Sequence, residues 1–229
     1  MGDSRTIVLV HGAWHGPWAW SKVVDPLRER GFAVETPTNP SRGSDTGALG
    51  DLYDDADNLR RTLSGIDGEA VVVAHSYGGV VATEGAAGAD NVSRIVYLTA
   101  FMLDEGESLF STVGGVEPDW WVKDAEERSL VTAQPEIRFY NTCSPEDTEF
   151  AVGQLVPQSL PAIKQPVRSV AWRDIPSAYV ICDQDNAIPV FAQEALSERA
   201  QEVRRLPSDH SPFLCMPDKL VDVIAELAA

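Results

Sequence analysis

One stretch of the chain decides its fold: Val71-Val72-Val73-Ala74-His75-Ser76-Tyr77-Gly78-Gly79. The valine run predicts a strand buried on both faces, as in a parallel sheet. The small residues Ala74 and Gly78 let the chain turn at once from this strand into the helix-compatible stretch 80–89. Such a corner holds Ser76 at its tip with the hydroxyl exposed. We therefore predict that Ser76 is a nucleophile on a strand–turn–helix unit.

The rest of the chain repeats this alternation of strand and helix. Further strands are predicted at Thr6–Val10, Phe32–Glu35, Ile95–Ala100, Tyr179–Cys182 and Val203–Leu206. Helices are predicted at 17–30, 52–63 and 220–227, where apolar residues recur with helical spacing. We therefore expect an α/β fold with a mainly parallel, doubly wound sheet.

Residues 102–172 interrupt this rhythm. They show no strand pattern and are rich in aromatic residues, among them Trp120 and Trp121. Ser144 followed by Pro145 predicts a helix start there. We expect a mostly helical cap, or lid, inserted into a core formed by residues 1–101 and 173–229. The alternative is an irregular excursion without function.

Composition limits the partners of the protein. The 229 residues suffice for one α/β domain, and the formal net charge of −17 disfavours nucleic acid and anionic membranes. No apolar run approaches the roughly 18 to 20 residues of a membrane span. The first residues lack the features of a signal peptide, so we expect a cytoplasmic protein. A monomer or homodimer is expected.

No cofactor or metal ion is predicted from motifs. The cysteines Cys143, Cys182 and Cys215 are widely spaced without a metal-binding pattern and are expected to be reduced, buried thiols. His11 and His15 are four residues apart, but they flank a glycine turn and lack an accompanying glutamate. Hydrogen bonding within the loop explains them better than metal binding. Phosphate-loop and dinucleotide-binding glycine motifs do not occur.

A serine nucleophile needs a general base. His210, the only histidine C-terminal to Ser76, follows the last predicted strand and is expected to be this base. The base in turn needs an orienting carboxylate.

Asp183 and Asp185 are the candidates for this carboxylate, because both lie where a strand ends and open α/β sheets build their sites. Asp185 is favoured because it lies in the loop proper, whereas Asp183 lies at the strand end. Asp104 is a distant third. Asp209 is too close to His210 and is expected to be a surface acid.

The developing oxyanion needs two preorganised donors. One is expected from the backbone N–H of Tyr77, directly after the nucleophile. The other is expected from the loop 11–13, where Gly12 permits a close approach and the N–H of Ala13 is the candidate donor. Gly12, Trp120 and Trp121 are expected at the substrate pocket.

The chain resembles the plant methylesterase and hydroxynitrile lyase branch of the α/β-hydrolases and its bacterial esterase relatives. The stretches that carry the resemblance are 8–20, 74–79, 185–189 and 208–210. It spans about residues 6–100 and 177–229 and is vague in the cap. It implies an α/β-hydrolase fold, a triad of Ser76, Asp185 and His210, and oxyanion donors at Ala13 and Tyr77.

Two departures from the family pattern favour an esterase over a lyase. The lyases of this branch carry Thr at the position of Gly12 and Lys at the position of Ser211. We therefore expect a serine carboxylesterase acting on a small or medium, largely apolar ester through an acyl-enzyme. The alternatives are hydrolysis of a thioester, a lactone or a C–C bond, or a small-ligand-binding protein on a hydrolase scaffold.

Overall fold

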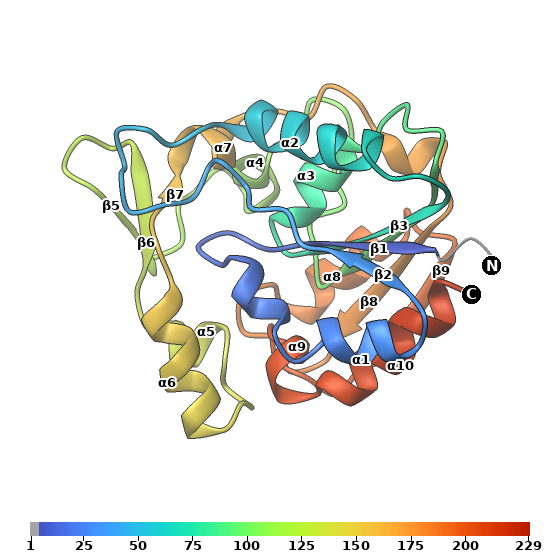
Figure 1. Ribbon diagram of the computed structural model, residues 1–229. Helices are drawn as coiled ribbons and strands as arrows, with labels where there is room; N and C mark the ends of the chain where they lie inside the picture. Colours follow the sequence, from blue (N-terminus) through green and yellow to red (C-terminus); the bar gives the residue numbers. More distant parts are fainter. Residues whose placement is uncertain (1–4) are drawn as a thin grey trace.

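A six-stranded parallel sheet runs through the computed structural model, which describes residues 5–229 (Figure 1). Its strand order is β2-β1-β3-β4-β8-β9. The strands are β1 (Thr6–Val10), β2 (Ala33–Glu35), β3 (Ala70–His75), β4 (Val92–Leu98), β8 (Ser177–Cys182) and β9 (Glu202–Leu206). The prediction of a mainly parallel sheet is confirmed, and all six predicted strands are present within a few residues.

The centre of the sheet forms the core. Every residue of β1, β3 and β8 is buried, which is why these strands read as unbroken apolar runs. The edge strand β9 instead exposes most of its residues, and its arginines discourage pairing with another chain.

Helices cover both faces of the sheet. Figure 1 shows α2 (Leu52–Ser64) and α3 (Gly78–Gly85) on one face, and α1 (Val24–Glu29) and α10 (Pro217–Leu227) on the other. The remaining α-helices of the described residues outside 102–172 are α8 (Val190–Ser197) and α9 (Pro212–Cys215). None of the helices in residues 5–229 has the length and apolar character needed to cross a membrane.

The first predicted helix is divided in two. A 3₁₀ turn, η1, spans Pro17–Trp20, and α1 begins only at Val24. Pro26 explains the break, because in one continuous helix its missing N–H would leave a carbonyl in the preceding turn without a partner. With α1 starting at Val24, Pro26 lies in the first turn, where no N–H is needed.

The segment 102–172, called the cap segment below, contains a small sheet that the sequence did not predict. Three antiparallel strands in the order β5-β6-β7 span Trp121–Lys123, Ser129–Thr132 and Gln158–Ser159. The strands are too short to show an alternating pattern. Helices still hold more of its residues: α4 (Leu109–Thr112), α5 (Pro135–Arg138), α6 (Pro145–Gln154), α7 (Leu160–Lys164) and the 3₁₀ turn η2 (Ala171–Arg173).

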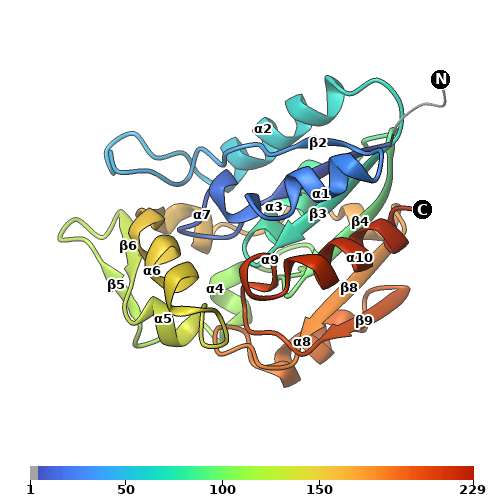
Figure 2. The ribbon, with the colours of Figure 1, turned by 60° about the horizontal axis from the view of Figure 1, so that its bottom comes forward.

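The cap segment projects to one side of the main sheet (Figure 2). Its helix α6 begins as predicted, with the Ser144 hydroxyl accepting the N–H of Asp147 and Pro145 in the first turn. Strand β7 is tied to the core, because the Ser159 N–H donates to the Ser41 carbonyl at 2.7 Å.

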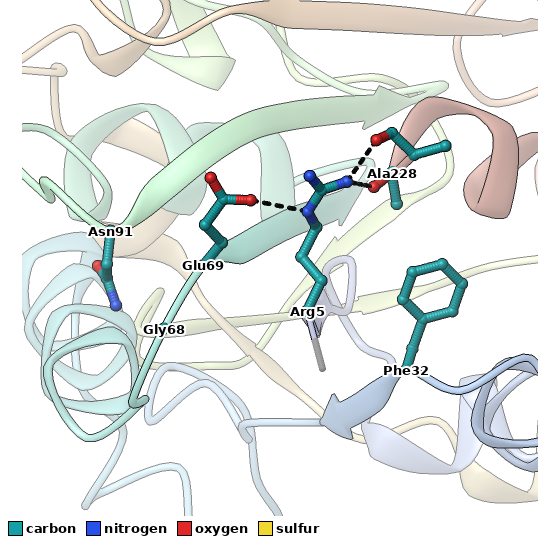
Figure 3. Close-up of a pocket in the computed structure, with 7 residues that line it drawn as sticks. Arg5, Phe32, Gly68, Glu69, Asn91 and Ala228 are labelled. Carbon is teal, nitrogen blue, oxygen red and sulfur yellow. Dashed lines mark hydrogen bonds and ion pairs between the residues drawn. The ribbon is translucent and has the colours of Figure 1, made fainter. Parts of the chain in front are cut away.

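A surface hollow of about 650 Å³ lies at the amino ends of the strands (Figure 3). There Arg5 forms an ion pair with Glu69 at 2.8 Å and donates to the backbone carbonyls of Ala228 and Ala229. These contacts fasten the end of α10 to the starts of β1 and β3. Ser76 and the other predicted site residues lie at the carboxyl ends, so this hollow is separate from them.

Candidate active site

Ser76 occupies a strained corner between β3 and α3. Its φ of 54° is left-handed, which is uncommon for a residue with a side chain. The neighbouring chain leaves no space around the corner: a Cβ at Gly78 would lie 2.6 Å from the carbonyl oxygen of Val10, and one at Gly79 would lie 2.7 Å from that of Phe101. Gly78 and Gly79 thus allow the close packing that keeps Ser76 at the tip of the corner.

The serine side chain reaches a small cavity of about 60 Å³, called the serine cavity below. Ser76 is 8% exposed and His210 is 2% exposed, and both line this cavity. The other lining residues are Ala13, Trp14, Phe101, Leu109, Val113, Pro118, Trp120, Trp121, Phe139, Ala187 and Ile188. The wall is therefore mainly aromatic and aliphatic, as small-molecule sites usually are.

An outer groove of about 710 Å³ adjoins the serine cavity. It lies between the cap segment and α8, and its far wall includes Phe191 and Leu196. The two spaces share Phe101, Val113, Pro118, Trp120, Ala187 and Ile188. Trp120 is the largest of the side chains that line both the narrow space at the serine and the wider apolar space.

His210 and Asp185 form a buried pair. Nδ1 of His210 lies 2.7 Å from Oδ2 of Asp185, whose side chain is fully enclosed. The Asp185 carboxylate also accepts the Thr99 hydroxyl at 2.5 Å and the N–H groups of Ala187 and Ile188 at 2.6 and 2.9 Å. These donors hold the carboxylate in place, so that it fixes the orientation of the imidazole.

The other carboxylate candidates lie elsewhere. Asp183 forms an ion pair with Arg205 at 2.6 Å, and Asp104 pairs with Arg173. Asp209 was expected to be a surface acid, and this expectation is wrong. Its side chain is fully buried, because Thr142 and Cys143 of the cap segment cover it.

His75 packs against His210 and forms a hydrogen bond to its backbone. Its Nε2 lies 2.8 Å from the backbone carbonyl of His210, and the two ring centroids are 4.5 Å apart. Burial holds the pKa of His75 well below its usual value. The neutral ring therefore donates its Nε2 proton to that carbonyl.

His11 and His15 each form a hydrogen bond to the backbone of the loop 11–13, which adjoins Ser76. Nδ1 of His11 lies 2.9 Å from the Gly12 carbonyl, and Nδ1 of His15 lies 2.8 Å from the Ala13 carbonyl. Burial lowers the pKa of His11 to about 4 and that of His15 to about 3. Both rings are therefore neutral near pH 7, and each donates to its carbonyl.

These hydrogen bonds set the orientation of the peptide groups that follow Gly12 and Ala13. Because the Gly12 carbonyl faces His11, the N–H of Ala13 in the same peptide points the opposite way. Over residues 5–229, neither the Ala13 N–H nor the Tyr77 N–H donates to another protein group. Both are thus free to bind an oxyanion.

Gly12 itself does not line the serine cavity, although the sequence placed it at the pocket. A Cβ at this position would lie 2.9 Å from His75 Nδ1 and 2.9 Å from Ser76 Cβ. The glycine instead lets the loop 11–13 pack directly against the serine corner. Trp120 and Trp121, the other predicted pocket residues, do line the cavity.

A buried polar network holds the side chain of Tyr77, the residue that follows Ser76 at the corner. The Tyr77 hydroxyl donates to Oδ2 of Asp55 at 2.6 Å, and the Ser41 hydroxyl donates to the same oxygen. Gln158 of β7 donates to Ser41 at 2.7 Å. Burial raises the pKa of Asp55 to about 7. The network connects α2, the serine corner and the cap segment.

Several of these supporting residues escaped the sequence analysis. Thr99 follows β4 at the carboxyl edge of the sheet, so its place after a strand could have indicated it. Asp55 and Gln158 gave no such signal, because their partners are distant in the chain.

In chemical terms, the site brings a serine and a carboxylate-oriented histidine to one apolar cavity. In the part of the chain that the structure describes, no hydrogen bond joins the Ser76 hydroxyl to the His210 ring. Hydrogen bonds of this kind are often long in free enzymes and tighten when substrate binds.

Comparison with known proteins agrees with the fold. Residues 7–223 match the family model described as "Alpha/beta hydrolase family". The chain is 27% identical to the carbendazim hydrolyzing esterase of Nocardioides sp., with 96% of this chain and 98% of that protein covered. It is 26% identical to Methylesterase 1 of Arabidopsis thaliana, with 96% and 95% covered.

A solved structure shows the same fold. The pyrethroid hydrolase from Sphingobium faniae JZ-2 superimposes with a TM-score of 0.86 at 23% identity, over 98% of this chain and 97% of the other. These similarities confirm the resemblance noted from the sequence, to plant methylesterases and bacterial esterases.

Proposed function

Because the chain belongs to the alpha/beta hydrolase family, we propose that it is a serine carboxylesterase with Ser76 as nucleophile. One observation carries the proposal: Ser76, held at a φ of 54°, and His210, paired with Asp185 at 2.7 Å, line the same apolar cavity. The esterases and hydrolases among its relatives support this reaction class.

In the proposed mechanism, Ser76 Oγ attacks the ester carbonyl while His210 Nε2 takes the hydroxyl proton. Asp185 keeps the Nδ1 proton on His210 and stabilises the imidazolium that forms. The N–H groups of Ala13 and Tyr77 bind the developing oxyanion. His210 then gives the proton to the leaving alcohol, and a water molecule releases the acid by the reverse sequence.

The walls of the site favour an apolar substrate. The serine cavity is lined by tryptophan, phenylalanine and aliphatic side chains, and the outer groove offers further apolar surface. A net charge of −17 works against polyanionic substrates. We propose that one part of the ester binds beside Ser76 and that a larger apolar part extends past Trp120.

The geometry at Gly12 argues against cyanohydrin cleavage. Since a single added carbon there would lie 2.9 Å from both His75 and Ser76, the corner has no room for the threonine of the lyases. Ser211 supplies no cation next to His210. Both groups that the related lyases carry are thus missing.

Hydrolysis of p-nitrophenyl esters of increasing acyl length tests the proposal. Wild type and Ser64→Ala, which removes an exposed serine on α2, should turn over the esters equally. Ser76→Ala should lose at least about a thousandfold in kcat. Undiminished turnover in Ser76→Ala would refute the assignment of the nucleophile.

A further inference from the structure

A cluster of two thiols and one carboxylate lies next to His210 in sequence but outside the mechanism described above. Sγ of Cys143, Sγ of Cys215 and a carboxylate oxygen of Asp209 all lie within 4.8 Å of one another. Cys143 comes from the loop between α5 and α6, Asp209 directly precedes His210, and Cys215 ends α9. The fold therefore brings together groups whose spacing in the sequence gives no metal-binding pattern.

We propose that Cys143, Asp209 and Cys215 bind a thiophilic divalent cation of the zinc type. Thiolate sulfur and carboxylate oxygen are both ordinary zinc ligands. At zinc bond lengths, a sulfur and an oxygen at two corners of a tetrahedron are about 3.6 Å apart. Here the Cys143 thiol donates to Asp209 Oδ2 at 3.6 Å, and the Cys215 thiol donates to the other oxygen, Oδ1, at 3.3 Å. A cation that replaced these two thiol protons would therefore face both carboxylate oxygens.

The charge of Asp209 points to a cation independently. The side chain is fully buried, and no lysine, arginine or histidine among residues 5–229 forms an ion pair with it. Its hydrogen-bond donors are two backbone N–H groups and the two thiols, all of them neutral. A buried carboxylate without a positive partner is costly. A cation bound between the carboxylate and the two thiolates would supply the missing charge.

The surroundings hold the carboxylate as outer-shell groups do in metal sites. The Thr142 N–H donates to Oδ2 of Asp209 at 2.8 Å, and the Ser211 N–H donates to Oδ1 at 2.9 Å. The Ser208 hydroxyl lies 3.1 Å from Cys215 Sγ and is a hydrogen-bond partner of that sulfur.

Cys143 and Cys215 are only partly buried. Binding releases the thiol protons, so affinity should increase with pH.

Such a site would fasten the cap segment to the core. Cys143 belongs to the cap segment, whereas Asp209 and Cys215 belong to the segment that carries His210. The neighbouring Phe139 lines the serine cavity and lies 5.5 Å from the His210 ring. A bound ion would thus fix one wall of the cavity relative to the histidine.

Cobalt titration of the reduced, chelator-treated 229-residue protein tests the proposal. Wild type should bind one equivalent of Co²⁺ and show the intense thiolate-to-cobalt absorption of a tetrahedral site, which one equivalent of Zn²⁺ then removes. The control Cys182→Ala, which lacks the buried thiol of β8, should behave like wild type. Cys143→Ser and Cys215→Ser should each lose at least about tenfold in affinity, as weakened metal sites do.

Three results would overturn the proposal. The first is that reduced wild type fails to bind Co²⁺ or Zn²⁺ at equimolar, micromolar concentration. The second is that Cys143→Ser, folded by circular dichroism, binds as tightly as wild type. The third is an intact mass two hydrogens lighter before reduction together with no metal binding afterwards, since the pair would then be a disulfide couple.

Discussion

Nδ1 of His210 lies 2.7 Å from Oδ2 of Asp185, and both side chains are buried at the carboxyl edge of the sheet. Asp183, only two residues away, points instead to Arg205 at the surface. The chain therefore contains two neighbouring aspartates in different environments. This pair provides a direct test of the orienting role of Asp185.

Asp185→Asn should lower kcat by about 10³ to 10⁴, because the amide favours the wrong imidazole tautomer. Asp183→Asn removes only an exposed ion pair and should change kcat less than about twofold. Ester hydrolysis by both purified variants measures the difference. Equal losses in the two variants would contradict the assignment.

Gly12→Ala should distort the serine corner. The added Cβ would lie 2.9 Å from Ser76 Cβ and His75 Nδ1, and neither neighbour is the end of a flexible chain. We expect about 1–3 kcal/mol of destabilisation and at least about a tenfold loss in kcat. Gly153→Ala on α6, where a Cβ meets no atom within 4 Å, is the matched control. Thermal unfolding and kinetics on both variants decide the matter, and a fully active Gly12→Ala would refute the packing argument.

Trp120→Ala should widen the substrate range. The side chain lines both the serine cavity and the outer groove, so its removal should enlarge both spaces. The ratio of kcat/KM for a bulky aromatic ester to that for an acetate ester should increase about tenfold. Trp172→Phe, which lies outside both spaces, should leave this ratio unchanged. A ratio that does not change in Trp120→Ala would place the larger group of the substrate elsewhere.

Acid should destabilise the protein through its buried histidines. His11 and His15 have pKa values of about 4 and 3, and that of His75 is well below its usual value. The unfolded chain binds these protons below about pH 6.5 while the folded chain does not. The free energy of unfolding should therefore decrease as the pH falls from about 6.5 toward 4.

Asp55 acts in the opposite direction. Its pKa of about 7 lies above the unfolded value, so the folded chain binds this proton first, and its contribution to stability increases as the pH falls from 7 to 4. Near pH 5 the free energy of unfolding should therefore fall less steeply with decreasing pH in wild type than in Asp55→Asn. Urea unfolding at several pH values measures these slopes. The exposed Asp57→Asn should follow wild type, and identical slopes for all three proteins would show that Asp55 is ionised when folded.

Much of the fold could be predicted because its strands are buried on both faces. A continuous apolar run such as Val71–Val73 needs no partner to be recognised. The small sheet of the cap segment could not be predicted, because a strand such as β7 has only two residues, too few to show an alternating side-chain pattern. Pro26 likewise indicated a helix break only once the start of α1 was known.

The candidate site, like the fold, could be predicted only in part from the sequence. Ser76, Asp185 and His210 each follow a strand, so their places in the chain indicated a common edge. Asp209 was misjudged because its covering residue Thr142 lies 67 positions away in the chain. Networks such as Tyr77–Asp55 depend on tertiary contacts that no local pattern reveals.

Covalent trapping of Ser76 tests the central claim most directly. Wild type, treated with a fluorophosphonate ester and analysed by intact mass and peptide mapping, should gain one phosphonyl group on Ser76 and lose its esterase activity in parallel. Ser76→Ala should gain none. An adduct on another residue, or full inactivation of wild type without an adduct on Ser76, would contradict the claim that this serine is the nucleophile.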